Sequence, residues 1–289
     1  MAVLLSSIFS SKKYEGATWK VLSGLCFASV NGLAKMVELP VVQTVCLQNL
    51  IGSFLLMGIL GTNVKGVFLK KAYLYRSLAA LPGVLFWLSA IRRLPLSQAV
   101  ALGFLGPFFT TLGAKIFLKE TLGLKRMMAI FLGSFGGIIV VYGGRTIEYD
   151  IRSFDYTIVL PILATLSFSI SSLIGKYLSL KEKPLPMACS LMMYLGLLLL
   201  PSLPFWICPS GMHFFILILL GALAALAHFS MGQAFCCADL IFLLPFGSTR
   251  FIASTLIGWY IYDQMPTYWV FIGMIVTLGG LWILASAKK

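Results

Sequence analysis

The sequence is dominated by long apolar blocks of about 20 residues, which short basic or Pro/Gly-rich breaks separate. A helix needs about 20 apolar residues to cross the roughly 30 Å hydrocarbon core of a bilayer. Only helices and closed barrels span lipid, because every backbone polar group must be bonded internally. The blocks lack the two-residue alternation of barrel strands. The pattern therefore predicts an all-α, polytopic membrane protein.

We expect ten transmembrane helices from these blocks. No connecting segment is long enough to form a soluble domain, and the short apolar run at residues 1–11 lacks the preceding basic region of a cleaved signal peptide. The predicted spans cover residues 17–36, 40–60, 72–91, 95–118, 125–143, 155–177, 186–207, 211–235, 239–262 and 266–287.

The formal net charge of +13 arises from basic residues that sit in short loops rather than in one patch. This distribution indicates membrane topology and no nucleic-acid partner. Sixteen of the 22 Lys and Arg residues, Lys20 and Arg76 among them, fall on the face of the N-terminus, five on the opposite face, and Arg250 lies within a span. The positive-inside rule then places both termini in the cytoplasm. We expect the protein in the cytoplasmic (inner) membrane.

The chain also resembles itself. An offset of 141 residues places Phe27, Asn31 and Lys35 on Phe168, Ser172 and Lys176, and an offset of 144 aligns the segments that begin at residues 90 and 234. We therefore expect two five-helix repeats, residues 1–150 and 151–289, and a repeat of five spans inverts the second copy. Inverted repeats are typical of secondary transporters that work by alternating access, although channels and some membrane enzymes also have repeats.

Two sets of motifs resemble those of a known family. The run "LPLSQAVALGFLGPFFTTLGAKIFLKETLG" at residues 94–123 is followed by "FLGSFGGIIVV" at residues 131–141. The second half carries a matching set of residues in family spacing: Gly221, His228, Ala234, Ala238, Pro245, Phe246, Thr249, Arg250, Gly258 and Pro266. The chain is similar, over its whole length, to EamA-type ten-helix members of the drug/metabolite transporter superfamily. It departs from them at Gln264, where Glu is common, and at Gln48 and Asn49, where Arg is frequent.

Arg250 is the clearest candidate for contact with a substrate. It lies eleven residues into its predicted span, about 17 Å along the axis and too deep for easy snorkelling. A buried charge at that depth is costly, so it marks a functional site or a structural bond. It would bind a carboxylate or phosphate, with Ser254 one turn away on the same face, or it would bond carbonyls near the break at Pro245.

Further candidates lie on equivalent faces of the two halves. Phe27, Asn31 and Lys35 share a stripe on the first span, and Phe168, Ser172 and Lys176 share one on the sixth. Such stripes are typical of a cavity lining, whereas lysines at span ends also snorkel to headgroups. His228 would contact substrate, relay protons or form a helix–helix hydrogen bond.

Trp87 and Gln48 complete the predicted substrate contacts. "GPF" at residues 106–108 and "LLPFG" at residues 243–247 would break the fourth and ninth spans, exposing backbone groups to a solute or kinking the helices. Six cysteines, expected as buried thiols, have no metal-like spacing: Cys26, Cys46, Cys189, Cys208, Cys236 and Cys237.

These features predict a secondary transporter of a small polar organic metabolite, an amino acid or an amino-acid nucleoside such as S-adenosylmethionine. A drug exporter, a channel and a lipid scramblase remain alternatives. We found no motif for hydrolytic or metal-dependent catalysis, so we expect no enzyme, catalytic residue, metal or cofactor. The expected partners are the small-molecule substrate and membrane lipid, with the chain a monomer or homodimer.

Overall fold

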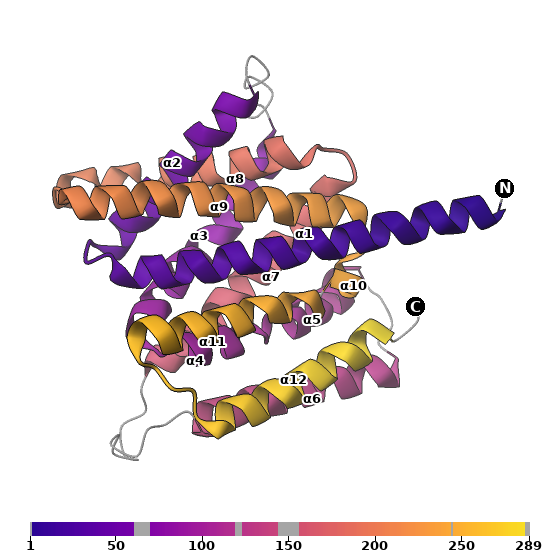
Figure 1. The fold of residues 1–289 in the computed structure, drawn as a ribbon. Coiled ribbons are helices and arrows are strands. Elements are labelled where there is room, and N and C mark those ends of the chain that lie inside the picture. The colour runs from indigo at the N-terminus through magenta and orange to yellow at the C-terminus, as the bar shows by residue number, and fades with distance from the viewer. Residues whose placement is uncertain (1, 61–69, 119–122, 144–155, 244, 287–289) are drawn as a thin grey trace.

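The computed structural model describes residues 2–60, 70–118, 123–143, 156–243 and 245–286, and these residues form helices and connecting turns without strands (Figure 1). The first half contains α1 (Ala2–Met36), α2 (Val41–Leu60), α3 (Lys71–Arg93), α4 (Leu96–Gly103), α5 (Gly106–Leu118) and α6 (Leu124–Gly143). The second half contains η2 (Tyr156–Ile158), α7 (Val159–Ser179), α8 (Pro184–Leu199), η3 (Leu200–Phe205), α9 (Gly211–Cys237), α10 (Leu240–Leu243), η4 (Pro245–Gly247), α11 (Ser248–Tyr262) and α12 (Tyr268–Ser286).

Several of these helices are long and apolar enough to cross a membrane. Within the described part of the chain, six stretches meet both requirements: α2, α3, α4 continuing into α5 as far as Gly113, α7, α8 with η3, and α9. The all-α, polytopic membrane class expected from the sequence is therefore correct. Helix α1 begins at Ala2, before residue 17 where the first membrane span is expected to start, and its N-terminal part extends past the neighbouring helices (Figure 1).

The two predicted breaks are present. Helix α4 ends at Gly103 and α5 begins at Gly106, with short-range bonds from the Phe104 and Leu105 N–H groups to Ala101 and Leu102 carbonyls. In the second half, α10 gives way to the 3₁₀ turn η4 before α11 starts at Ser248. Proline has no N–H to donate to a helix, which explains a break at the start of η4.

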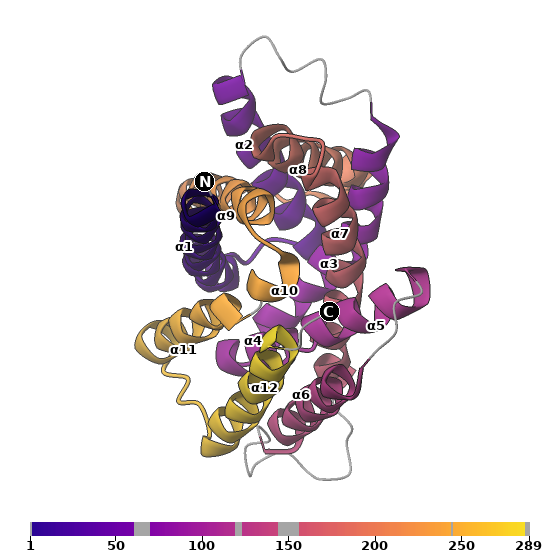
Figure 2. The same ribbon diagram turned by 90° about the vertical axis from the view of Figure 1, so that its right-hand side faces the viewer.

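Helices of the first half pair with helices of the second. Helix α1 packs along α9, α2 along α8, α3 along α7 and α6 along α12. Figures 1 and 2 both show α6 and α12 side by side at one edge of the bundle. This pairing places the interior of the bundle between the two halves.

Small residues allow α6 and α12 to approach closely. A Cβ at Gly136 would lie 2.6 Å from the Gly273 carbonyl oxygen and would also collide with Thr277 Oγ1. A Cβ at Gly280 would lie 2.9 Å from the Ala129 carbonyl oxygen. Membrane helices commonly associate through such small residues, because lipid supplies no hydrophobic drive to hold two helices together.

We therefore expect Gly136→Ala to destabilise the protein. The added methyl group meets backbone rather than a movable side chain, and overpacking of this kind costs about 1–3 kcal/mol. Thermal unfolding in detergent, followed by the loss of the monodisperse chromatographic peak, measures the effect. Gly279→Ala is the matched control, since nothing lies within 4 Å of a Cβ built there. Equal melting temperatures for the two variants would contradict the packing argument.

The cysteine prediction is right for part of the set. Cys26, Cys46 and Cys189 are buried, whereas Cys208 and Cys236 are exposed. Cys208 follows η3 in a connecting segment, and Cys236 lies at the C-terminal end of α9. Both positions are at the ends of apolar segments, where burial depends on the neighbouring helix rather than on composition.

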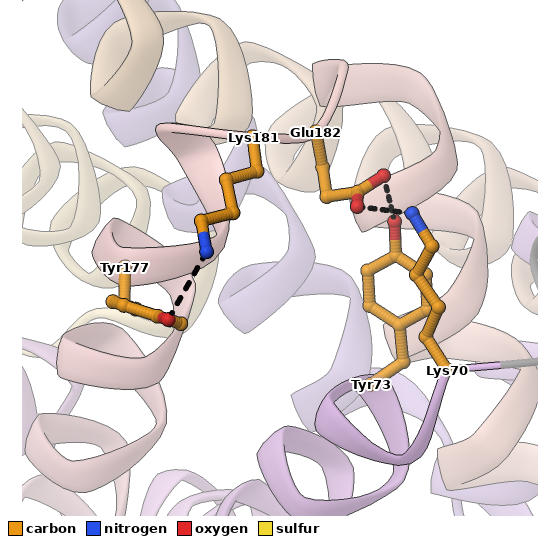
Figure 3. Close-up of polar contacts among 5 residues, drawn as sticks. All are labelled: Lys70, Tyr73, Tyr177, Lys181 and Glu182. Carbon is orange, nitrogen blue, oxygen red and sulfur yellow. Dashed lines mark hydrogen bonds and ion pairs between the residues drawn. The ribbon is translucent and has the colours of Figure 1, made fainter.

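A polar cluster ties the two halves together at the N-terminal end of α3. Lys70 Nζ donates to one carboxylate oxygen of Glu182, and the Tyr73 hydroxyl donates to the other at 2.9 Å (Figure 3). Glu182 lies in the turn between α7 and α8, where Lys181 Nζ also contacts the Tyr177 hydroxyl at 3.4 Å. Partial burial alone would raise the pKa of Glu182, but the hydrogen bonds from Lys70 and Tyr73 and the charge of Lys70 hold it below its usual 4.5.

Because the folded state lowers this pKa, the contribution of Glu182 to stability is fully present above pH 4.5. It is lost as the pH falls through the lower pKa of the folded state. We expect Glu182→Gln to lower the free energy of unfolding by about 0.2–1 kcal/mol at pH 7, the range for exposed pairs. The difference in melting temperature from wild type should shrink below pH 4.5. Glu38→Gln, at an exposed carboxylate, is the control, and a difference that grows on acidification would refute the assignment.

Candidate functional site

A cavity of about 300 Å³ lies between the two halves. Its walls come from α1, α2 and α3 on one side, from α7, α8 and α9 on the other, and from the broken segments around Gly103 and Gly247. Pockets that bind small organic molecules begin at about this volume and combine apolar walls with a few polar groups. The cavity is therefore the candidate site.

Asn31 organises the polar centre of the cavity. Its Oδ1 accepts a hydrogen bond from Trp87 Nε1 at 3.0 Å and a second from the Arg250 guanidinium at 3.3 Å. Arg250 Cζ lies 4.5 Å from the centre of the Trp87 ring and 5.1 Å from that of Phe27. Both distances are within the range of cation–π attraction. One amide oxygen thus fixes an arginine and an indole that belong to different halves.

The break in the ninth predicted span positions Arg250. Because η4 interrupts the helix, α11 starts at Ser248, and Arg250 is its third residue. Gly24 allows the start of α11 to lie against α1. A Cβ at Gly24 would be 3.2 Å from the backbone nitrogen of Arg250 and 2.5 Å from Thr249 Oγ1. The guanidinium therefore enters the cavity from a helix end rather than from a continuous helix face.

Two aromatic contacts flank this centre. Phe27 meets the His228 ring edge-on, with centroids 5.1 Å apart and an interplanar angle of 85°. Trp87 meets Phe168 at 6.2 Å and 60°. Each contact joins a helix of one half to a helix of the other, so the aromatic walls of the cavity cross the boundary between the halves.

Eight of the eleven predicted contact residues line the cavity, and three do not. Those that line it are Phe27, Asn31, Gln48, Trp87, Phe168, Ser172, His228 and Arg250. Outside it lies Ser254, fully buried one turn further along α11 than Arg250. Lys35 and Lys176 also lie outside it.

The two lysines bond backbone carbonyls instead of facing the cavity. Lys35 Nζ donates to the Leu94 carbonyl at 2.8 Å, at the end of α3. Lys176 Nζ donates to the Phe235 and Ala238 carbonyls at 2.8 and 3.0 Å, at the end of α9. A helix end leaves carbonyls without intrahelical partners, and a lysine satisfies them. Both ammonium groups are therefore bonded within the protein.

Two cationic residues that sequence reasoning assigned to the cytoplasmic face are cavity residues. Lys20 and Arg76 both line the cavity. Arg76 is 8% exposed, and its Nη1 donates to the Met187 carbonyl at 3.2 Å. A helical stripe through Arg76, Ala80 and Trp87 would have placed the arginine on the same face as the tryptophan. A charge near the end of a span has the same sequence pattern in a loop, which hides such a stripe.

An aromatic and polar cavity inside a bundle of apolar helices defines a membrane protein that handles a small solute. The EamA-like transporter family model matches residues 15–143. A riboflavin transporter of Brucella anthropi is 30% identical over 71% of this chain and 73% of its own length. A riboflavin transporter of Vibrio cholerae is 28% identical over 91% of this chain and 90% of its own. An S-adenosylmethionine uptake transporter of Rickettsia felis is 25% identical over 79% and 76%.

The chain belongs to the EamA-like transporter family of the drug/metabolite transporter superfamily, as its motifs predicted. It is a transporter of a small metabolite rather than an enzyme. A solved crystal structure of a protein 17% identical in sequence superposes with a TM-score of 0.66 over 95% of this chain and 96% of that chain, which supports the fold. Among the described residues, no three metal-ligating side chains come together.

Asn31→Ala should destabilise the cavity centre, because it leaves the buried Trp87 N–H and Arg250 without their shared acceptor. The loss of a buried partner costs about 1–3 kcal/mol. Asn31→Asp is the control that keeps the acceptor oxygen and adds attraction to Arg250. Thermal unfolding in detergent should rank the proteins with Asn31→Ala lowest and Asn31→Asp at or above wild type. The reverse order would exclude Asn31 as the acceptor that holds both groups.

Proposed function

We propose that the protein is a secondary carrier that moves a small polar metabolite with a planar heteroaromatic ring across the cytoplasmic membrane by alternating access. The observation that carries the proposal is the Asn31 centre. Asn31 holds Arg250 against the faces of Trp87 and Phe27, and it does so in a cavity shared by both halves. The ring surfaces that Arg250 leaves uncovered would stack on a planar substrate ring, and the polar groups of the centre would donate to its carbonyl oxygens.

Riboflavin is the first candidate substrate. It is a flat three-ring heterocycle with carbonyl groups at one edge and a chain of hydroxyl groups, which Gln48 and the serines of α7 would bond. Among the relatives, the riboflavin transporters are 27–30% identical to this chain and the S-adenosylmethionine transporters 23–25%. S-adenosylmethionine is the second candidate. The cationic side chains of the cavity repel its positively charged sulfonium group. They also repel the ammonium group of a free amino acid.

Equivalent contacts in the two halves support an inverted repeat of five spans each, and thus ten spans in all. The offset of 141 residues that relates Lys35 to Lys176 also relates Phe27 to Phe168 and Trp87 to His228. The acceptors of the two lysine bonds, Leu94 and Ala238, are related by the offset of 144. The offset of 141 turns the Phe27–His228 contact into the Trp87–Phe168 contact, because each residue of one pair is equivalent to a residue of the other. The α6–α12 contact repeats likewise, because Gly136 corresponds to Gly280 and Ala129 to Gly273.

This symmetry suits alternating access. With both termini in the cytoplasm, the Lys35–Leu94 bond lies towards the outer face and the Lys176–Ala238 bond towards the inner face. Two arrangements related by the repeat have similar energies, so one end of the cavity can open while the other stays closed. A channel or lipid scramblase would need no such exchange. Small proton-driven drug exporters resembling this family use a Glu within their first span, and the described residues of α1 place no acid in the cavity.

The test is uptake of riboflavin into liposomes that contain the purified protein, with and without riboflavin preloaded inside. We expect saturable uptake that preloading stimulates. Trp87→Ala should raise the half-saturation concentration about tenfold, the equivalent of roughly 1.4 kcal/mol of lost stacking. Trp282→Ala, at an indole 73% exposed on α12, is the matched control and should leave uptake unchanged.

Other outcomes of this assay separate the alternatives. Flux that rises linearly with concentration would replace the carrier by a channel. Saturable uptake of S-adenosylmethionine without uptake of riboflavin would replace the first candidate by the second. Saturable riboflavin uptake with equal half-saturation concentrations for the two tryptophan variants would show that the substrate ring does not stack on Trp87.

A further inference from the structure

The cavity wall carries three cationic side chains, Lys20, Arg76 and Arg250. No Asp or Glu is among the described residues that line it. The ion pair that the described chain does contain, between Lys70 and Glu182, lies at the end of α3 and not in this wall. The cavity therefore has an excess of positive charge without a protein counter-charge in the described part of the structure.

The hydrogen bonds of these cations leave donors unused. Arg76 bonds the Met187 carbonyl through Nη1, and its buried Nε has no partner. Arg250 bonds Asn31, and its Nε likewise has no partner. Lys20 Nζ contacts Met231 Sδ at 3.2 Å, a weak acceptor. Asn31 Nδ2 is also buried without a partner.

Buried cations and unused donors are both costly unless something pairs with them. Native proteins satisfy most buried polar groups, so a set of orphaned donors around one cavity indicates a missing acceptor. An acceptor that supplies negative charge and several lone pairs would satisfy both requirements. Phosphate and carboxylate oxygens have this character, and they bind guanidinium groups through two parallel hydrogen bonds.

Arg76 is the residue placed to bind such a group. It is on the same helix as Trp87 and precedes it by eleven residues, about 17 Å along the axis. Arg250 already stacks on the rings of Trp87 and Phe27. His228 lines the same cavity as both arginines. Arg76 and Trp87 therefore lie at different levels of the cavity wall along α3.

We propose that the carrier prefers substrates with an oxyanion, a phosphate ester or a carboxylate, over their neutral counterparts, and that Arg76 binds this group while the ring stacks at Trp87. This inference rests on the proposed carrier function and adds a charge requirement to it. A neutral metabolite such as riboflavin would occupy the ring site alone. Its 5′-phosphate would occupy both sites and neutralise the excess charge.

Ligand-induced thermal stabilisation of the purified full-length protein measures the preference with three matched pairs of probes. The pairs are riboflavin and its 5′-phosphate, adenosine and its 5′-monophosphate, and tryptophol and indole-3-acetate. The first two test phosphate and the third tests carboxylate. We expect the anionic member of at least one pair to bind about tenfold or more tightly than the neutral member, as hydrogen bonds to a charged group allow.

Variants of Arg76 test its role in this preference. Arg76→Gln should reduce the ratio of affinities within the preferred pair to about one, leaving the affinity for the neutral member close to wild type. Arg76→Lys keeps the charge and should keep part of the ratio, which guards against a folding defect in the glutamine variant. Lys71→Gln is the matched control: it removes one charge at an exposed position of the same helix and should leave the ratio unchanged.

The outcomes distinguish this inference from the proposed function. Saturable riboflavin transport without preference for any anionic probe would overturn the inference and leave the carrier assignment standing. Preference for an adenosine or indole anion without flavin binding would support the inference and overturn the flavin assignment. An anionic preference that persists in Arg76→Gln would overturn the role of Arg76.

Discussion

Close contact between the two halves of the chain is the constraint on which the rest of the structure depends. Lipid provides no hydrophobic drive for helices to associate, so packing and interhelical hydrogen bonds must hold the bundle together. The small residues of α6 and α12 bring backbone against backbone, and Gly24 brings the start of α11 against α1. Since each main helix pair joins one half to the other, any space left in the bundle lies between the halves. The cavity is that space.

The chemistry of the cavity follows from where the helices end. A continuous helix would place Arg250 in the middle of a packed face, whereas the 3₁₀ turn η4 makes it the third residue of a new helix. A helix start has its own partial positive charge. The guanidinium therefore adds to a field that is already positive, and Asn31 supplies an acceptor oxygen without cancelling the charge. This arrangement favours the approach of negatively charged or electron-rich groups.

Much of this arrangement could be predicted from the sequence, because membrane helices are marked by length and composition. The breaks near Gly106 and Pro245 follow from residue type, and Phe27, Asn31 and Trp87 stand out as aromatic or polar side chains within apolar segments. The charge distribution predicts Arg76 and Lys20 at the cytoplasmic face rather than in the cavity, because a charge near the end of a span has the same pattern whether it faces water or a cavity. Lys35 and Lys176 were ambiguous for the same reason, and carbonyls from distant helix ends decided their positions.

The two halves of the proposed repeat have equivalent structural contacts but different side chains in the cavity. Lys35 and Lys176 make corresponding bonds at opposite ends, yet Asn31 corresponds to Ser172 and Trp87 to His228. A carrier built this way would close its cavity in a similar way at both ends, but it would present different binding surfaces to the two sides of the membrane. Its half-saturation concentrations for entry and exit would then differ. The maximal rates must differ in proportion, because a passive carrier cannot shift the equilibrium of its solute. Divergence of the duplicated halves would thus adjust the side on which the carrier saturates first while leaving the final distribution of solute unchanged.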